Sequence, residues 1–303
     1  MFRNLLCIYH ANCADGFTAA WVVRAFCAQN RIEVEFHPGV YQNPPPDVTG
    51  RDVLLVDFSY KEPVLRDMAA RARSIAIIDH HKTAADDLAF AGPLPSWREW
   101  IEGESIARRY TGGLPVAALF DTSRCGAGLT WDYFFRGKKR PVLVDYVEDR
   151  DLWRFALSDS RAVNAAIFSH KYTFSQWDAL ATALDTNLDG VAQEGRAIER
   201  KHHKDIEELV NVVTRPMLIG GQRVLMANLP YTYTSDAGHL LAEGEPFAGC
   251  YWDTPEGRVF SLRSREGGAD VSAIAAQYGG GGHKHAAGFR VPFDQLGQFE
   301  VTS

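Results

Sequence analysis

The 303-residue sequence has no apolar run that approaches the ~20 residues needed to cross a bilayer. It also lacks the layout of a secretory signal peptide, because its first apolar run leads directly into a motif. Cysteine is scarce: there are five, an odd number, with no CxxC pair of the kind that binds zinc. Together these absences predict a cytoplasmic protein with reduced thiols and no membrane partner.

The sequence has no excess of basic residues, since its formal net charge is −6. This charge argues against broad binding of duplex nucleic acid, which requires a basic face. It is compatible with a small anionic substrate held by a few local cations. The length is sufficient for two domains, and a composition with 46% hydrophobic and 23% charged residues is that of an ordinary globular protein.

Three apolar runs end in side chains that can bind metal ions. Residues 5–9, 53–56 and 75–78 lead, respectively, into His10, into Asp57 and into the triplet Asp79, His80 and His81. Continuous apolar runs of this length are typical of parallel strands that are buried on both faces. Ligands bind just outside the carboxyl ends of such strands, so we expect these side chains to meet at one rim of a sheet.

The order of patterns predicts an α/β protein with two domains. Residues 51–82 have the strand, helix and strand pattern of a parallel sheet. Further helices are expected at 16–27, 116–120, 126–135 and 141–147, with two more between 160 and 184. We predict a parallel-sheet domain over 1–186, a connecting helix over 187–213 and a smaller α/β domain over 214–303.

In the smaller domain, strands are expected at 223–228, 247–252 and 258–265, and helices at 235–242 and 271–278. Asp270 is placed to cap the last of these helices. Four glycines at 279–282 follow it and precede His283. Glycine tolerates positive φ and lets successive N–H groups approach an anion, so the run is a candidate phosphate-binding loop, with a flexible turn as the simpler alternative. Arg263 can hold a phosphate in bidentate fashion.

Carboxylate and imidazole side chains gather at the predicted rim: His10, Asp15, Asp57, His80 and Asp149. Two of them have a simpler interpretation when taken alone, Asp15 as a helix cap and the acidic run at 148–151 as a solvated helix end. As a set without thiolate they favour Mn²⁺, with Mg²⁺, Fe²⁺ or Co²⁺ as competitors. Two ions about 3.5–4 Å apart offset the repulsion between carboxylates and activate a water that attacks a phosphoester or phosphoanhydride.

These stretches together resemble the DHH family of phosphoesterases with a C-terminal DHHA1 domain, which includes nanoRNases and other oligoribonuclease-like enzymes. The resemblance covers nearly the whole chain. The stretches that carry it are the namesake triplet Asp79, His80 and His81, and residues 10–16, 56–59, 149–153, 261–264 and 279–288. It implies a metal-dependent hydrolase with the site in the cleft between the domains. One departure is Cys13, which stands where the family usually has the first of two aspartates.

The resemblance also implies roles for individual residues. His10 and Asp57 bind one metal ion, and the other is bound by Asp15, Asp57, His80 and Asp149, with Cys13 as a further candidate ligand. His81 lies near the bridging water or the scissile phosphate as a hydrogen-bond donor or general acid, and Asp79 either orients it or supports the metal ligands from behind. The substrate is held by Arg263, Ser264, Gly280, Gly281, Gly282 and His283.

The activity expected from these residues is hydrolysis of short single-stranded oligonucleotides or small nucleotides to mononucleotides. Two alternatives use the same site: a phosphomonoesterase acting on pAp, and a cyclic-dinucleotide phosphodiesterase. A third alternative, a nucleotide-binding protein with reduced catalysis, follows from Cys13. A homodimer is left open.

Overall fold

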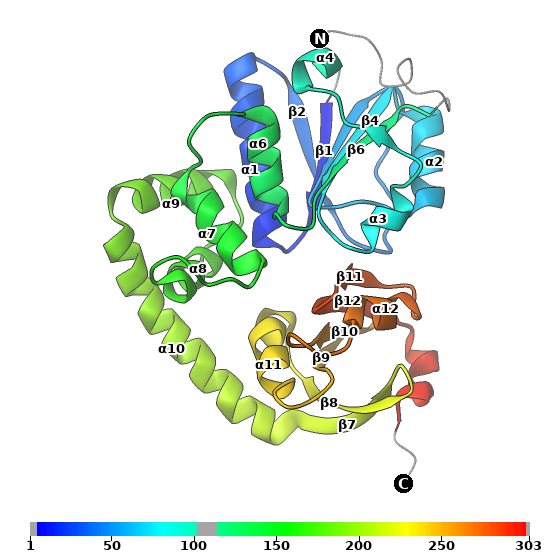
Figure 1. Cartoon of the computed structure of the whole chain (residues 1–303), viewed down its shortest axis with the longest axis vertical. Coiled ribbons are helices and arrows are strands. Elements are labelled where there is room, and N and C mark those ends of the chain that lie inside the picture. The colour runs from blue at the N-terminus through cyan, green and yellow to red at the C-terminus, as the bar shows by residue number, and fades with distance from the viewer. Residues whose placement is uncertain (1–4, 102–113, 301–303) are drawn as a thin grey trace. The chain divides into compact units, whose positions relative to one another are not determined.

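The computed structural model describes residues 5–101 and 114–300, which form two compact units (Figure 1). The first unit comprises the chain up to His80 together with Ala84–Ile198, and the second comprises His81–Thr83 and the chain from Glu199. Each unit is built around a six-stranded sheet. The predicted α/β fold class is confirmed.

The first sheet is parallel throughout. Its strands are β1 (Leu5–His10), β2 (Val34–Gly39), β3 (Asp52–Val56), β4 (Ser74–Asp79), β5 (Gly92–Pro93) and β6 (Val116–Phe120), in the order β2-β1-β3-β4-β6-β5. Strand β2 is added on one side of β1, and the chain then crosses to add β3 on the other side of β1. The topological switch point therefore lies between β1 and β3, which is where sheets of this kind bind ligands.

Strand β3 shows why this sheet is covered on both faces. All five of its residues are buried. Val53 and Leu55 pack into one core, and Leu54 and Val56 pack into the other. Because side chains alternate along a strand, a continuous apolar run requires helices on both sides.

One core contains side chains of α1 (Ala14–Asn30), α6 (Gly126–Phe134), α7 (Val142–Asp151), α8 (Ser160–Ser169) and α9 (Phe174–Thr186). The other contains side chains of α2 (Glu62–Arg71) and α3 (Ala84–Asp87). Figure 1 shows α1 and α6 on one side of the sheet and α2 and α3 on the other. The short α4 (Trp97–Ile101) and the first part of α10 (Leu188–Val213) also belong to this unit.

The helix predicted at residues 116–120 is wrong. These residues form β6, which pairs in parallel with β4. The segment is an uninterrupted apolar run with no polar face, which suits a strand in a sheet that is covered on both sides. Val116 and Ala117 are instead buried beside Ile75 and Ala76. The helices predicted at 126–135 and between 160 and 184 are present as α6, α8 and α9.

Helix α10 (Leu188–Val213) carries the chain from the first unit to the second, and the two units divide within it, between Ile198 and Glu199. None of the helices within residues 5–101 and 114–300 is long and apolar enough to cross a membrane.

The second sheet is mixed: β8 and β9 are parallel, and every other neighbouring pair is antiparallel. Its strands are β7 (Thr214–Ile219), β8 (Gln222–Asn228), β9 (Ala248–Thr254), β10 (Gly257–Arg263), β11 (Gly281–His283) and β12 (Ala286–Val291), in the order β11-β12-β10-β9-β8-β7. Its helical segments are η1 (Tyr231–Tyr233), α11 (Thr234–Leu241), α12 (Val271–Ala276) and η2 (Phe293–Phe299). As predicted, Asp270 caps α12 by accepting from the N–H groups of Ser272 and Ala273.

Candidate metal centre

Strands β1, β3 and β4 are neighbours, so their carboxyl ends lie at one rim. His10 is the last residue of β1, Asp57 follows β3, and His80 follows β4. Oδ1 of Asp57 lies 3.0 Å from Nε2 of His80, and Oδ2 lies 3.5 Å from Nδ1 of His10. Each oxygen of Asp57 thus faces a different imidazole, so this carboxylate is placed to contribute to two neighbouring ion sites.

The backbone of Asp57 is strained. Its φ is 54°, in the left-handed region that residues other than glycine seldom adopt. Such a conformation costs on the order of 1–3 kcal/mol and persists only where the surroundings enforce it. Its N–H donates to the carbonyl of Ile78 at 2.9 Å, and the residue is 1% exposed. Strain at a buried carboxylate is typical of a functional site.

Asp15, in the first turn of α1, joins the cluster and also holds α6. Its Oδ2 lies 3.5 Å from Nε2 of His80. Its two oxygens accept from the N–H groups of Gly126 at 2.6 Å and Ala127 at 2.8 Å. The N-terminus of a helix favours negative charge, so this contact stabilises the carboxylate. Asp15 is therefore a helix cap, but for α6 rather than for its own helix.

The acidic run at the end of α7 contributes Asp151 to the cluster. Its Oδ2 lies 3.7 Å from Nε2 of His80. Donor atoms of Asp15, His80 and Asp151 all lie within 4.8 Å of one another, and such a group could hold a metal ion.

Asp149, the ligand expected from the sequence, is not brought into this cluster. Its carboxylate accepts from the N–H groups of Ala156 at 2.9 Å and Leu157 at 3.2 Å, in the loop that follows α7. Residues two apart on a helix point in nearly opposite directions, so only one of Asp149 and Asp151 can face the rim. The sequence pattern contains no signal that selects Asp151.

The charges of the cluster are strongly coupled. Burial, with the carboxylates of Asp57 and Asp151, raises the pKa of Asp15 well above its usual value. Burial lowers the pKa of His80, but the hydrogen bond with Asp57 and the charges of the three carboxylates outweigh it, and the net pKa is well above the usual value. Carboxylates this close ionise together only with positive charge among them. Oxygen and imidazole donors suit a divalent ion such as Mn²⁺, Mg²⁺, Fe²⁺ or Co²⁺.

Cys13 lies beside this cluster, at the N-cap position of α1. Burial, with the carboxylates of Asp57, Asp151 and Asp15, raises the pKa of its thiol well above the usual value. Since the thiolate is the form that binds metals, a protonated Cys13 is a weak ligand.

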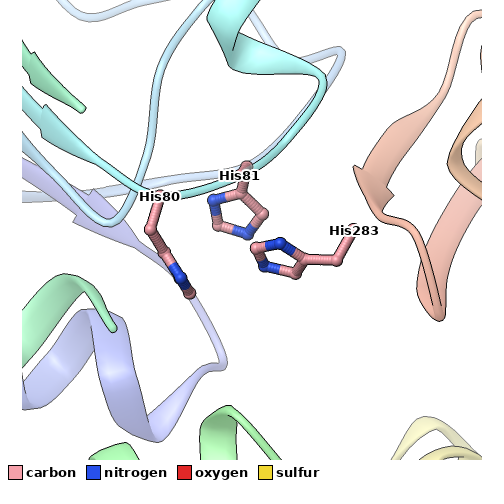
Figure 2. Close-up of side chains that lie close together, drawn as sticks. All are labelled: His80, His81 and His283. Carbon is pink, nitrogen blue, oxygen red and sulfur yellow. The ribbon is translucent and has the colours of Figure 1, made fainter. Parts of the chain in front are cut away.

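Asp79 and His81, on either side of His80, make different contacts. The carboxylate of Asp79 accepts from the N–H of His80 at 2.7 Å, which fixes the turn after β4. His81 follows and is grouped with the second unit. There its ring stacks on that of His283, with centroids 4.7 Å apart and planes 19° apart (Figure 2).

Two predicted substrate-binding residues lie at the end of β10. The guanidinium of Arg263 donates to the hydroxyls of Ser235 at 2.8 Å and Ser261 at 3.0 Å. Ser264 is 1% exposed, and its hydroxyl donates to the carbonyl of Ala269 at 2.7 Å. The structure thus orients Arg263 firmly and turns Ser264 inward.

The glycine run is a tight turn followed by a strand. The N–H groups of Gly279 and Gly280 donate to carbonyls of α12, and Gly281–His283 form β11. A Cβ at Gly280 would lie 2.1 Å from the carbonyl oxygen of Gly288. These glycines permit close backbone packing, and the first two N–H groups are not turned toward a common anion.

No protein-family model matches the chain. A protein of Acanthamoeba polyphaga mimivirus, described as Uncharacterized protein R106, is 27% identical over 305 residues. The match covers 93% of this chain and 66% of the viral protein, so the chain spans just under two thirds of that relative.

Two solved structures resemble the chain over most of its length. The pGpG-specific phosphodiesterase PggH of Vibrio cholerae is 14% identical, with a TM-score of 0.46, covering 98% of this chain and 96% of PggH. RecJ of Thermus thermophilus in complex with Mn²⁺ is 14% identical, with a TM-score of 0.49, covering 96% of this chain and 50% of RecJ. At these values neither likeness carries an argument about activity, which must come from the site.

Gly126→Ala is expected to weaken Mn²⁺ binding on the order of tenfold. A Cβ at this position would lie 2.4 Å from Cβ and 2.9 Å from Cγ of Asp57, so the carboxylate must move. A tenfold loss corresponds to about 1.4 kcal/mol, a modest displacement energy. Isothermal titration calorimetry with Mn²⁺ measures the change, and circular dichroism checks the fold. Gly297→Ala is the control, because a Cβ there meets nothing within 4 Å. Equal affinities for Gly126→Ala and the unsubstituted protein contradict this account.

Proposed function

We propose that this chain is a metal-dependent phosphoesterase of the DHH family with a DHHA1 domain. The observation that carries the proposal is Asp57, with one oxygen on His10 and the other on His80, at the ends of neighbouring parallel strands. The domain division at 1–186, 187–213 and 214–303 belongs to the same proposal. The reaction we assign is hydrolysis of phosphodiester bonds in short oligonucleotides or small nucleotides, with release of mononucleotides.

The proposed metal ligands follow the geometry of the rim. One ion is held by His10 and Asp57, and the other by Asp15, Asp57, His80 and Asp151, so that Asp151 replaces Asp149. Mn²⁺ is the proposed ion, with Mg²⁺, Co²⁺ and Fe²⁺ as competitors. When bound, a pair of such ions lowers the pKa of a shared water and offsets charge on the reacting phosphate.

The remaining residues either position other side chains of the site or contact the substrate. Asp79 fixes the turn that aims His80, since its carboxylate holds the N–H of that residue. In the proposed reaction, His81 donates a hydrogen bond or a proton to the scissile phosphate. Arg263 binds a substrate phosphate, supported by the two serine hydroxyls that hold its guanidinium in place. His283 stacks on His81 and keeps the imidazole in one orientation.

A short substrate fits this chain better than a duplex. The formal net charge of −6 leaves no general attraction to polyanions, so binding depends on a few placed cations. The pAp-type phosphomonoesterase and the cyclic-dinucleotide phosphodiesterase are alternatives that use the same ligands. A second candidate function, nucleotide binding with reduced catalysis, is favoured by one observation: the thiol of Cys13 stands beside the carboxylates with a raised pKa.

The activity is tested with Mn²⁺ and a panel of dinucleotides, longer oligomers, pAp and cyclic dinucleotides, with mononucleotide products separated by chromatography. Asp57→Ala is expected to lower kcat about 100- to 1,000-fold, an order of magnitude typical of losing a group that stabilises charge in the transition state. Asp67→Ala is the control, because within residues 5–101 and 114–300 Asp67 pairs with Arg71 alone, on the exposed face of α2. Full activity of Asp57→Ala contradicts the proposed centre.

Asp149→Asn is expected to lower the stability of the protein, whereas Asp151→Asn is expected to lower its affinity for Mn²⁺. Asp149→Asn leaves one of two backbone N–H groups without its acceptor, so the metal-free protein should lose about 1–2 kcal/mol of unfolding free energy. Asp151→Asn removes a charge that faces other carboxylates, so stability should hold while Mn²⁺ affinity falls about tenfold or more. Denaturant unfolding and Mn²⁺ titration measure the two quantities. A greater loss of affinity in Asp149→Asn than in Asp151→Asn would restore Asp149 as the ligand.

Cys13→Asp is expected to strengthen Mn²⁺ binding and to raise kcat, because a carboxylate replaces a protonated thiol beside the cluster. Cys13→Ser controls for loss of the thiol alone and should bind Mn²⁺ as the unsubstituted protein does. Calorimetric titration of all three proteins checks the order of affinities. If Cys13→Asp leaves affinity unchanged, this position is not a ligand position.

A further inference from the structure

A network of four charged side chains joins α6 to α7. Its members are two arginines and two carboxylates: Arg124, Asp132, Arg140 and Glu148. Asp132 accepts from Nε and Nη2 of Arg140 at 3.0 and 2.9 Å and from Nη2 of Arg124 at 2.7 Å. Glu148 accepts from Nη1 of Arg140 at 3.0 Å and from Nε of Arg124 at 3.2 Å. Each carboxylate thus pairs with both arginines, and the formal charges of the four side chains cancel.

Glu148 is the buried member of this network, and it has a further contact with α6. It is 8% exposed, and its Oε2 also accepts from the N–H of Cys125 at 3.2 Å. A Cβ at Gly128 would lie 2.1 Å from the same oxygen. The first turn of α6 therefore has room for this carboxylate because residue 128 is glycine.

Cys125 connects the network to the metal centre. It is the N-cap residue of α6, and the next two N–H groups, of Gly126 and Ala127, donate to Asp15 at 2.6 and 2.8 Å. Gly126 also borders Asp57, since a Cβ there would lie 2.4 Å from Cβ of that residue. Three successive N–H groups at this end of α6 therefore bind two carboxylates, one from the network and one from the metal centre.

Direction distinguishes these contacts from apolar packing. Burying a carboxylate costs desolvation free energy, so apolar side chains would hold two helices together at least as well. Hydrogen bonds depend on angle as well as distance, so they define where the end of a helix lies. A metal centre requires such definition, because coordination distances stay within about 0.2 Å of their ideal values. A charged network at this place therefore suits the demands of metal ligands better than those of a core.

We propose that Glu148 is a positioning residue for the metal centre. It holds the first turn of α6 at the place where that turn binds Asp15 and borders Asp57, and the two arginines hold its carboxylate in orientation. The inference rests on the proposed function and adds to it a residue that acts through α6 rather than by contact with the metal ion or the substrate.

Calorimetric titration of Glu148→Ala and Asp132→Ala with Mn²⁺ tests the proposal. Each substitution removes one carboxylate from the network, but of the two only Glu148 binds a backbone N–H among the residues that the structure describes. Mn²⁺ affinity should fall about tenfold or more in Glu148→Ala, a loss typical of removing a residue that supports metal ligands. It should stay within about twofold in Asp132→Ala, whose side chain is 44% exposed and forms weaker ion pairs.

Glu148→Gln and a measurement of stability separate positioning from a purely structural role. Glutamine keeps an oxygen for the N–H of Cys125, so Glu148→Gln should bind Mn²⁺ more tightly than Glu148→Ala. Denaturant unfolding of the metal-free proteins should show that both alanine variants lose stability. Equal losses of Mn²⁺ affinity in Glu148→Ala and Asp132→Ala, or no loss in Glu148→Ala, overturn the proposal.

Gly128→Ala disturbs the same contact without removing a charge. Its Cβ would displace Oε2 of Glu148 from the N–H of Cys125, so Mn²⁺ affinity should fall in this variant as well. If Glu148→Ala does not fold, Gly128→Ala takes its place in the comparison with Asp132→Ala, and an unchanged affinity then refutes the positioning role.

Amide hydrogen exchange distinguishes failure of this inference from failure of the proposed function. If the unsubstituted protein binds no Mn²⁺, the proposed metal centre fails, and the role of Glu148 is judged in the metal-free protein. The N–H groups of Gly126 and Ala127 should then exchange faster in Glu148→Ala than in Asp132→Ala, because the turn that carries them is no longer held. Equal exchange in the two variants contradicts the inference.

Discussion

Mutual repulsion among buried carboxylates is the constraint on which this structure depends. Asp15 and Asp57 are 2% and 1% exposed, and both lie within 3.5 Å of the same imidazole nitrogen of His80. Water cannot solvate them, so the protein must offset their charge by other means. It does so in part through the N-terminus of α6, whose N–H groups hold both oxygens of Asp15. The raised pKa of His80 places an imidazolium among the carboxylates, and a metal ion held by the cluster would offset the charge further.

Rigid elements hold this unfavourable grouping together. Asp57 and His80 leave adjacent parallel strands, and the N–H of Asp57 is tied to the carbonyl of Ile78. Gly126 lets α6 approach so closely that a Cβ at this position would lie 2.4 Å from Cβ of Asp57. The two cores that cover the sheet supply the stability that such a site costs. Their close packing also keeps the strained backbone in place.

The sequence predicted those parts of the fold and site that depend on the carboxyl ends of buried strands. His10, Asp57 and His80 are found together because parallel neighbours end at one rim, and an apolar run followed by a polar residue marks that end. Asp151 was beyond prediction, because the facing side of α7 depends on how the helix packs. The glycine run was expected to form a loop, yet its last two residues pair in β11. They pair antiparallel with β12 across a two-residue turn, Lys284 and His285, and a run of glycines has no alternating apolar pattern that would mark a strand.

The alternation of β3 between two cores has a consequence for how the chain can change over time. Val53 and Leu55 lie in one core, while Leu54 and Val56 lie in the other. Deleting or inserting one residue in this strand would exchange the faces of the side chains beyond the change and redirect Asp57 at its end. Length variation in descendants of this sequence should therefore be confined to the loops away from the rim, whereas β1, β3 and β4 keep their lengths as strictly as their terminal residues.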